Sequence, residues 1–489
     1  MLKAIFLSVL VGLAVQPVFS QFDKLVPEVP QDGAAFGYEV SQDEDYLIVG
    51  AKDEVNNDVK GGGAYIYHLE NGNWIEQAHL VPELASAGEF FGISVALSGD
   101  FALVGANGND IQGTNSGTAY IYQRQGESWD LFQTLSPQEL QPFDEFGISV
   151  DLSGSVAIIG AYSDATNGLF AGAAYVYEFI GQSWIETAKL LPEEVESEDK
   201  FGRSVDTDGK RIIVCRVLGD EQGTNSGAAY IYSKDGTGQW IQEAKLLAPD
   251  GTEEDRFGRS VGIAGEYAVV GAVLDDDNGN NSGAAYIFNN TPDGWVFRDK
   301  VTPSDGAAED FFGYALSFTP GYLLVGALNK DGTGSNTGAA YLFNQSGNDW
   351  VEIEKLTAAD EFELGSFGES VDINGSWLTI GAPYWGDNDM LPGTVYIRQA
   401  PLPLGRKKDN IAQFAIYPNP VTDEFRIFTP PGISVPVTFE LYNSSGNLVR
   451  ASELKKHRSV SVKDLPKGVY ILVVHTSTYL ANEKLLLIK

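Results

Sequence analysis

Short apolar runs alternate with polar turns along most of the chain. Each run is four to seven residues long, is rich in Val, Ile and Tyr, and is bounded by Gly, Asn and Asp. Runs of this length and composition are typical of β-strands, and none has the 3.6-residue period of a helix. The pattern therefore predicts an all-β protein.

One unit of this pattern recurs at intervals of 55 or 56 residues. The typical copy reads Phe-Gly-x-Ser-Val, a tight turn, an apolar run ending in Gly-Ala, a polar loop, Ala-Tyr-Ile-Tyr, a second turn, and Trp followed by Leu. Four strands per unit at a period near 50 residues predict the blades of a β-propeller. The seven copies begin at Phe36, Phe91, Phe146, Phe201, Phe257, Phe312 and Phe367.

The two ends of the array differ from its middle. Six copies contain a fourth strand marked by Trp, whereas the seventh stops after Val395-Tyr396-Ile397. Residues 22–27 resemble the missing strand, as their likeness to residues 188–192 shows. We therefore predict a seven-bladed propeller over residues 21–399, with residues 22–27 completing the last blade and removing an exposed sheet edge.

The flanking segments have a different character. Residues 1–20 combine Lys3, an apolar run and small residues before Gln21, which predicts a signal peptide. No other segment is long and apolar enough to predict a transmembrane helix. Residues 400–411 are rich in Pro and basic residues and are interpreted as a linker. Residues 412–489 contain strand-like runs at 425–428, 437–441, 459–462, 469–474 and 484–488, which predict a small immunoglobulin-like β-sandwich.

Charge and cysteine content narrow the possible partners. The formal net charge is -35, made up of -40 in residues 1–400 and +5 in residues 401–489. The acidic propeller would repel phosphates, so nucleic acid is excluded as a partner. A single cysteine, Cys215, forms no intramolecular disulfide, and the four histidines form no metal-ligand spacing, so no cofactor is required.

The repeated unit resembles the FG-GAP repeat of integrin α-chain propellers and of bacterial surface proteins. The resemblance rests on seven copies that begin with Phe-Gly, five of which read Phe-Gly-x-Ser-Val. Six copies continue to Gly-Ala, with a complete Gly-Ala-Pro at residues 381–383, and the fourth has Cys215-Arg216 instead. Integrin-type repeats place a calcium loop between the first two strands. Here that connection is the turn Ser98-Gly99-Asp100, which is too short to enclose a cation, so the integrin calcium sites are not expected.

The C-terminal region resembles the type A sorting domain of the type IX secretion system. The resemblance rests on a motif near the start of the domain, on a Gly-Val-Tyr motif and on a basic C-terminus. It implies recognition by the type IX machinery and delivery to the cell surface, the outer membrane or the extracellular space. The residues that carry it are Tyr417, Pro418, Asn419, Pro420, Gly468, Tyr470 and Lys489.

Residues that recur in most copies are interpreted as structural. Residues 258–262 read Gly-x-Ser-x-Gly, but the same serine recurs in five copies, which favours packing between blades over a catalytic nucleophile. An acid two residues before the Phe recurs in five copies and is expected to accept backbone N–H groups at the turn into the first strand. The serines are Ser94, Ser149, Ser204, Ser260 and Ser370, and the acids are Glu89, Asp144, Asp199, Asp255 and Asp310.

Departures from the repeat lie in the long connections, which we expect on one face of the disc, where a partner would bind. Asp275, Asp277 and Asn278 supply oxygen ligands, so this loop either binds Ca²⁺ or is a solvated acidic loop. Residues 383–390 form an aromatic and acidic loop able to stack on a sugar or a side chain. Its ligand-face candidates are Tyr384, Trp385, Asp387 and Asp389.

No set of residues in the sequence predicts a catalytic site. The preferred hypothesis is a non-catalytic binding or adhesion protein, exported and displayed, with an extracellular protein or glycan as its ligand. Two alternatives stay open. An extracellular polysaccharide lyase or hydrolase would need clustered acids, His, Tyr or Arg in the central channel, and a structural surface-layer protein would self-associate.

Overall fold

The computed structural model describes residues 22–400, apart from 83–85, 193, 195, 348, 375–376 and 387–389, together with 415–417, 424–428, 438–443, 448–453, 459–475 and 480–487. The predicted signal peptide and nearly all of the predicted linker lie outside these residues. The chain divides into two compact units, of which Phe22–Ala400 is one and the C-terminal strands belong to the other.

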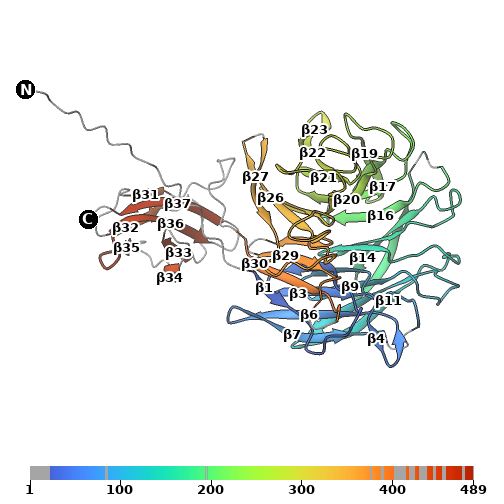
Figure 1. Cartoon of the computed structure of the whole chain (residues 1–489), viewed down its shortest axis with the longest axis horizontal. Coiled ribbons are helices and arrows are strands. Elements are labelled where there is room, and N and C mark those ends of the chain that lie inside the picture. The colour runs from blue at the N-terminus through green and yellow to red at the C-terminus, as the bar shows by residue number, and fades with distance from the viewer. Residues whose placement is uncertain are drawn as a thin grey trace, which may run out of the picture. The chain divides into compact units, whose positions relative to one another are not determined.

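Seven four-stranded antiparallel sheets make up the unit Phe22–Ala400, which is a seven-bladed β-propeller (Figure 1). Blades 1 to 3 consist of β2 (Phe36–Asp43), β3 (Tyr46–Ala51), β6 (Gly63–Glu70) and β7 (Asn73–Leu80); β8 (Ser94–Ser98), β9 (Phe101–Ala106), β10 (Thr118–Gln125) and β11 (Ser128–Leu135); and β12 (Ser149–Ser153), β13 (Val156–Ala161), β14 (Ala173–Ile180) and β15 (Ser183–Leu190).

Blades 4 to 7 repeat the same order of strands. They consist of β16 (Phe201–Thr207), β17 (Arg211–Arg216), β18 (Ala228–Lys234) and β19 (Trp240–Leu246); β20 (Phe257–Ala264), β21 (Tyr267–Ala272), β22 (Ala284–Thr291) and β23 (Gly294–Val301); β24 (Phe312–Thr319), β25 (Tyr322–Ala327), β26 (Ala339–Ser346) and β27 (Asp349–Leu356); and β28 (Val371–Asn374), β29 (Trp377–Ala382), β30 (Thr394–Gln399) and β1 (Asp23–Leu25).

The ring is closed by strands from the two ends of the propeller. β1 runs antiparallel to β30, with Leu25 opposite Val395 and Asp23 opposite Ile397. β1 is therefore the fourth strand of blade 7, and the backbone groups of β30 are paired on both sides, by β29 and by β1.

The Phe of each copy is buried between its own blade and the preceding one. In every blade this side chain is 0–1% exposed. Its ring meets the edge or tilted face of the Tyr in the third strand of the same blade, as Phe146 does with Tyr175 at a centroid distance of 5.3 Å. Such aromatic pairs add to the apolar area that each blade buries.

Glycine and serine bring neighbouring blades into close contact. A Cβ added to Gly105 would lie 2.0 Å from the carbonyl oxygen of Gly147 in the next blade, so only glycine fits there. Ser94 Oγ donates a hydrogen bond to this same carbonyl at 2.8 Å. Ser149, Ser260 and Ser370 make the equivalent bond to the following blade. The expected role of the serine in blade packing is confirmed in these four copies.

The connections differ between the two faces of the propeller. Tight hairpins join the first strand of a blade to the second and the third to the fourth, and they define the hairpin face. Long connections join the second strand to the third and the fourth to the next blade, and they define the long-loop face. In blade 1 the long connection contains a two-stranded ribbon, β4 (Val55–Asn56) and β5 (Val59–Lys60).

The C-terminal unit contains two antiparallel sheets, as expected of a β-sandwich. One sheet has the order β31 (Ala415–Tyr417), β32 (Glu424–Phe428) and β35 (Ser459–Ser461). The other has the order β34 (Leu448–Glu453), β33 (Thr438–Asn443), β36 (Gly468–His475) and β37 (Leu480–Leu487). Phe425, Phe439, Leu441 and Leu472 are buried.

Candidate functional site

A central channel encloses a cavity of about 480 Å³ lined by residues that belong to or adjoin the first strand of every blade. The first strand is the innermost in each sheet and enters the channel from the long-loop face. The third residue of the repeated unit therefore lies at the end of the channel on that face. We call these seven residues the channel mouth: Tyr38, Ile93, Ile148, Arg203, Arg259, Tyr314 and Glu369.

The channel mouth has a polar arc and an apolar arc. Blades 2 and 3 contribute Ile93 and Ile148, and the other five blades, which are consecutive around the ring, contribute Arg, Tyr or Glu. This is the variable position inside an otherwise regular motif. From the sequence, informative variation was expected only in the long connections, so this position was missed. The change from Ile to Arg, Tyr and Glu at one position of the repeat could have revealed it.

Three residues of the polar arc form a chain of contacts across neighbouring blades. The guanidinium carbon of Arg259 lies 3.6 Å from the centre of the Tyr314 ring. Tyr314 Oη donates a hydrogen bond to Glu369 Oε1 at 3.1 Å. Burial raises the pKa of the Tyr314 hydroxyl and also that of the Glu369 carboxyl. These groups are therefore held in place by one another and by the channel wall.

Glu39 is a second acid in the channel, next to the mouth. In five other blades this position of the repeated unit is a serine, such as Ser94 or Ser149. Burial raises the pKa of the Glu39 carboxyl to about 8, against the lowering effect of Arg259. At neutral pH this carboxyl is therefore mostly protonated and able to donate as well as accept a hydrogen bond.

Deeper in the channel, acids join adjacent blades. The backbone N–H of Thr207 donates to Asp151 Oδ2 at 2.8 Å, and that of Gln42 donates to Asp372 Oδ2 at 2.7 Å. Burial raises the pKa of Asp372 to about 6 and, together with the neighbouring Asp151, holds the pKa of Asp206 well above its ordinary value. These side chains satisfy the inner edges of the sheets, so we assign them a structural role.

The recurring acid before the Phe has the structural role expected from the sequence. The backbone N–H three residues earlier donates to the carboxylate in all five copies, for example from Gln141 to Asp144 at 2.7 Å and from Ala307 to Asp310 at 2.7 Å. The remaining bonds are those of Ser86 to Glu89, Glu196 to Asp199 and Thr252 to Asp255. The predicted turn-capping role is confirmed.

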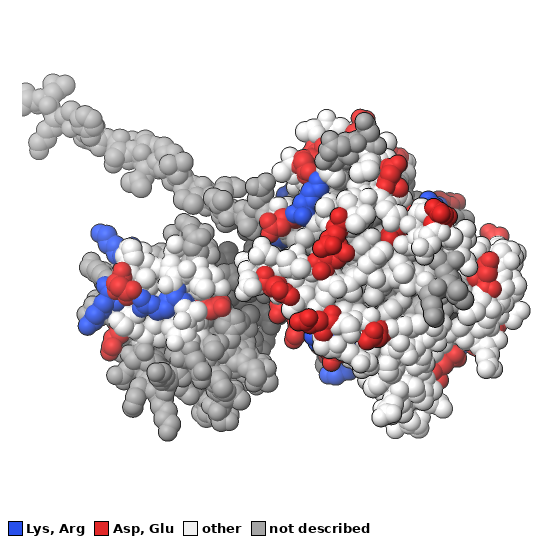
Figure 2. Space-filling model, turned by 90° about the horizontal axis from the view of Figure 1, so that it is seen from below, with Lys and Arg blue, Asp and Glu red and all other residues white. Residues whose placement is uncertain are grey.

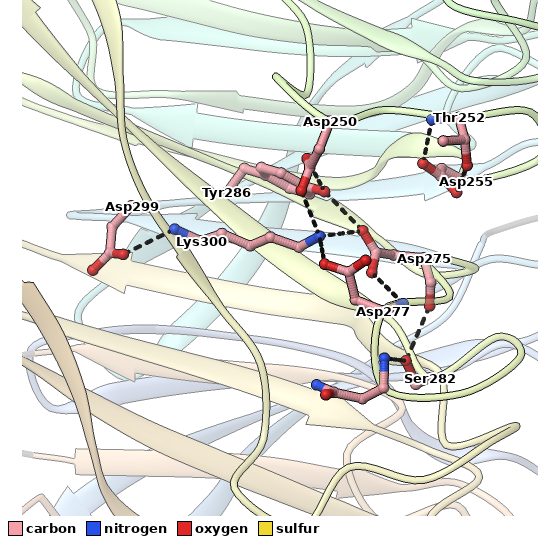
Figure 3. Close-up of polar contacts among 10 residues, drawn as sticks. Asp250, Thr252, Asp255, Asp275, Asp277, Ser282, Tyr286, Asp299 and Lys300 are labelled. Carbon is pink, nitrogen blue, oxygen red and sulfur yellow. Dashed lines mark hydrogen bonds and ion pairs between the residues drawn. The ribbon is translucent and has the colours of Figure 1, made fainter.

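The Asp275 loop surrounds an ammonium group (Figure 3). Lys300 Nζ lies 2.8 Å from Asp275, 2.6 Å from Asp277 and 3.0 Å from Asp250. Tyr286 Oη also donates to Asp275 Oδ2 at 2.7 Å. The third residue of the predicted calcium set, Asn278, contributes its backbone N–H to Ser282 Oγ at 3.2 Å.

Other blades contain the same combination of tyrosine, cation and acid. In blade 3, Asp164 accepts hydrogen bonds from Tyr175 Oη at 2.9 Å and from Lys189 Nζ at 2.8 Å. Blade 7 pairs Tyr396 and Lys24 with Asp360. The network around Lys300 is therefore a local form of a feature that recurs around the ring.

Two of the four ligand-face candidates are described. Tyr384 is 41% exposed, and its neighbours include Glu369 and Tyr314 of the channel mouth. Burial raises the pKa of Tyr384 to about 12. Trp385 instead contacts the protein itself, since Lys24 Nζ lies 2.8 Å from the centre of its ring. Asp387 and Asp389 lie outside the described residues.

In blade 4, Cys215-Arg216 replaces the Gly-Ala of the other copies, and both residues belong to the internal structure. Arg216 is buried and pairs with Asp199 at 2.9 Å and with Glu221 at 2.7 Å. Cys215 is also buried, accepts a hydrogen bond from the Ser204 backbone N–H, and has its pKa raised by burial to about 11. These contacts give both residues a packing role.

Among the predicted sorting residues, Tyr417 lies in β31, and Gly468 and Tyr470 lie in β36. Tyr470 is buried and its hydroxyl donates to the Pro466 carbonyl at 2.8 Å. Pro418, Asn419, Pro420 and Lys489 lie outside the described residues. The described residues contain no helix that is long and apolar enough to cross a membrane.

The seven blades and the channel define a repeat β-propeller, and comparison with known families identifies the repeat. The FG-GAP repeat matches seven segments that cover most of the chain, and the chain belongs to this family. The matched segments are residues 19–67, 74–122, 129–177, 184–232, 240–288, 295–343 and 350–398. The secretion system C-terminal sorting domain matches residues 415–489. The comparison with curated proteins gave no match.

The sorting domain identifies the protein as a substrate of the type IX secretion system. It marks the protein for export to the cell surface or the extracellular space. The propeller is therefore presented outside the cell, where acidic side chains are spread over the face shown in Figure 2.

Proposed function

We propose that the protein is a surface-displayed binding protein whose ligand site is the channel mouth on the long-loop face. The observation that carries this proposal is the asymmetry of the mouth. Seven equivalent positions have the same backbone environment, yet they hold two Ile, two Arg, two Tyr and one Glu. A purely structural ring has no need of such variety, whereas a binding site needs different groups at defined positions.

Between the two faces of the disc, exposed apolar side chains favour the long-loop face, and the outer strands expose a further set that includes Ile75, Ile185 and Val351. Among the described residues, large hydrophobic side chains on the hairpin face are exposed only at Ile180. The long connections expose several, and such exposure is common where partners bind. They include Val29, Val55, Ile111, Phe143, Leu169, Leu364 and Leu391.

Binding is favoured over catalysis by the electrostatics of the mouth. A tyrosine that acts as a general base needs a pKa lowered toward neutrality. Burial instead raises the pKa of Tyr38 and of Tyr314. The two tyrosines are therefore suited to donating hydrogen bonds and to ring contacts rather than to removing a proton.

A glycan and protein array probed with the full chain tests this proposal. We expect ligands whose binding is lost in a variant that carries Arg203→Ile and Arg259→Ile. Isoleucine is the residue that blades 2 and 3 place at the same position, so these substitutions suit the backbone. Binding that survives both substitutions would place the ligand site elsewhere and refute the proposal.

A second candidate function is cleavage of an extracellular polysaccharide. One observation favours it: Glu39, protonated at neutral pH, lies in the channel with Glu369, Arg259 and two tyrosines. Such an acid is able to protonate a leaving oxygen. Incubation with polysaccharides and measurement of new reducing ends or unsaturated products tests this function. Activity that Glu39→Gln abolishes would support it, and intact polymer after prolonged incubation would count against it.

A further inference from the structure

The two arginines of the channel mouth form no ion pair within the described part of the chain, unlike five other arginines of the propeller. Arg211 and Arg216 each form ion pairs with acids, as do Arg124, Arg256 and Arg398. Arg203 and Arg259 form none with the described residues, although residues 1–400 carry a net charge of -40. Glu369 and Glu39 influence Arg259 electrostatically but form no ion pair with it, so both arginines are able to pair with an anion from outside.

The contacts of Arg259 occupy only part of its guanidinium. Its guanidinium carbon lies 3.6 Å from the centre of the Tyr314 ring, and the group also donates a hydrogen bond to the Tyr314 hydroxyl. A guanidinium has five N–H donors, so others remain for a ligand. Arg203, from the neighbouring blade, lines the same cavity. A carboxylate accepts two parallel hydrogen bonds from the N–H fork of a guanidinium, so either arginine is able to hold one.

The other residues in and beside the channel mouth suit a ligand ring that has polar groups at its edge and one apolar face. Ile93 and Ile148 form an apolar wall, and Tyr38 offers an aromatic ring. Glu39 and Glu369 supply carboxyl oxygens that accept hydrogen bonds from hydroxyl groups. A sugar ring combines these properties, because it has hydroxyl donors at its edge and C–H groups on its face.

We infer that the channel mouth binds a saccharide whose terminal ring carries a single carboxylate, held by Arg203 and Arg259. This inference rests on the proposed function and specifies its ligand. A cavity of about 480 Å³ is in the size range of small-ligand sites. The net charge of -40 in residues 1–400 disfavours a polymer with many negative charges, so the charge is confined to the ring that enters the channel.

A peptide C-terminus also carries a carboxylate but fits the mouth less well. Close to that carboxylate it offers one amide N–H, whereas a sugar ring offers several hydroxyl donors to Glu39 and Glu369. A peptide is therefore the alternative that the experiment must separate from the saccharide.

Calorimetric titration of the full chain tests the inference with three probes. The first is a disaccharide ending in a uronic acid, the second is its neutral counterpart, and the third is a tetrapeptide with a free C-terminal carboxylate. We expect the uronic acid probe to bind at least tenfold more tightly than the other two. Arg203→Ile and Arg259→Ile should each weaken this binding at least tenfold.

Arg256→Gln is the matched control. Arg256 lies three residues before Arg259 on the same face but does not line the channel, so its substitution should leave the affinity unchanged. Thermal unfolding followed by tryptophan fluorescence establishes that each variant is folded before it is titrated.

The outcomes separate the inference from the proposed function. Tighter binding of the neutral disaccharide or of the peptide, lost in the arginine variants, would overturn the inference and leave the channel mouth as the ligand site. Uronic acid binding that survives both isoleucine substitutions would overturn both. Equal loss in Arg256→Gln would also overturn the inference, because it would assign the effect to surface charge.

Discussion

Glu39 gives the propeller a pH-dependent stability that can be calculated in advance. Its carboxyl occupies a serine position, and burial raises its pKa from 4.5 to about 8. Between these two pH values the folded protein binds a proton that the unfolded chain has released. Its contribution to stability is therefore complete below pH 4.5 and is lost as the pH rises through 8.

The size of the effect follows from the shift in pKa. Each pKa unit corresponds to about 1.4 kcal/mol, so the full shift would amount to roughly 5 kcal/mol. Because Glu39 lines a cavity that water enters, we expect about 2–3 kcal/mol instead. Glu39→Gln keeps the shape of the side chain but does not ionise, so the variant should lack this part of the pH dependence.

Denaturant unfolding of the full chain between pH 4.5 and 8.5 measures the effect. All eight tryptophans lie between Trp74 and Trp385, so their fluorescence reports on the propeller alone. The stability of Glu39→Gln relative to the natural protein should rise by about 2–3 kcal/mol across this range. Glu127→Gln, on an exposed hairpin, should show no such rise. A difference between Glu39→Gln and the natural protein that stays constant with pH would refute the reasoning.

Three other predictions concern the tail, the acidic loop and the ion pair in blade 4. Deletion of residues 412–489 should retain the protein in the periplasm, and surface display of the truncated chain would contradict this. If the Asp275 loop binds calcium, the ion must displace Lys300. Calcium should then raise the melting temperature, and Asp275→Ala should abolish the rise. An unchanged melting temperature would show that this loop is not a calcium site. Arg216→Met should cost about 3–5 kcal/mol of stability because it leaves buried acids unpaired, whereas Arg211→Met, at the surface, should cost under about 1 kcal/mol.

The propeller could be predicted because its determinants are local and repeated. Phe buried between two neighbouring blades, glycine at the close approach of two blades, and serine bonded to the next carbonyl each recur at fixed spacing. In the C-terminal unit the sequence predicted β32, β33, β35, β36 and β37 but missed β31 and β34, which are short or carry few apolar residues.

The candidate site was harder to predict because it depends on contacts between distant segments. Arg203, Arg259 and Glu369 are brought together only when the ring closes, and each is a single substitution within a regular motif. Similarly, Lys300 lies 25 residues beyond Asp275, so the pairing that neutralises the acidic loop could not be read from the loop itself.

A crystal structure of the full chain bound to a ligand identified on the array tests the central claim most directly. We predict that the ligand occupies the channel mouth and contacts Arg203 and Arg259. A ligand bound instead to the outer strands or to the hairpin face would contradict the claim.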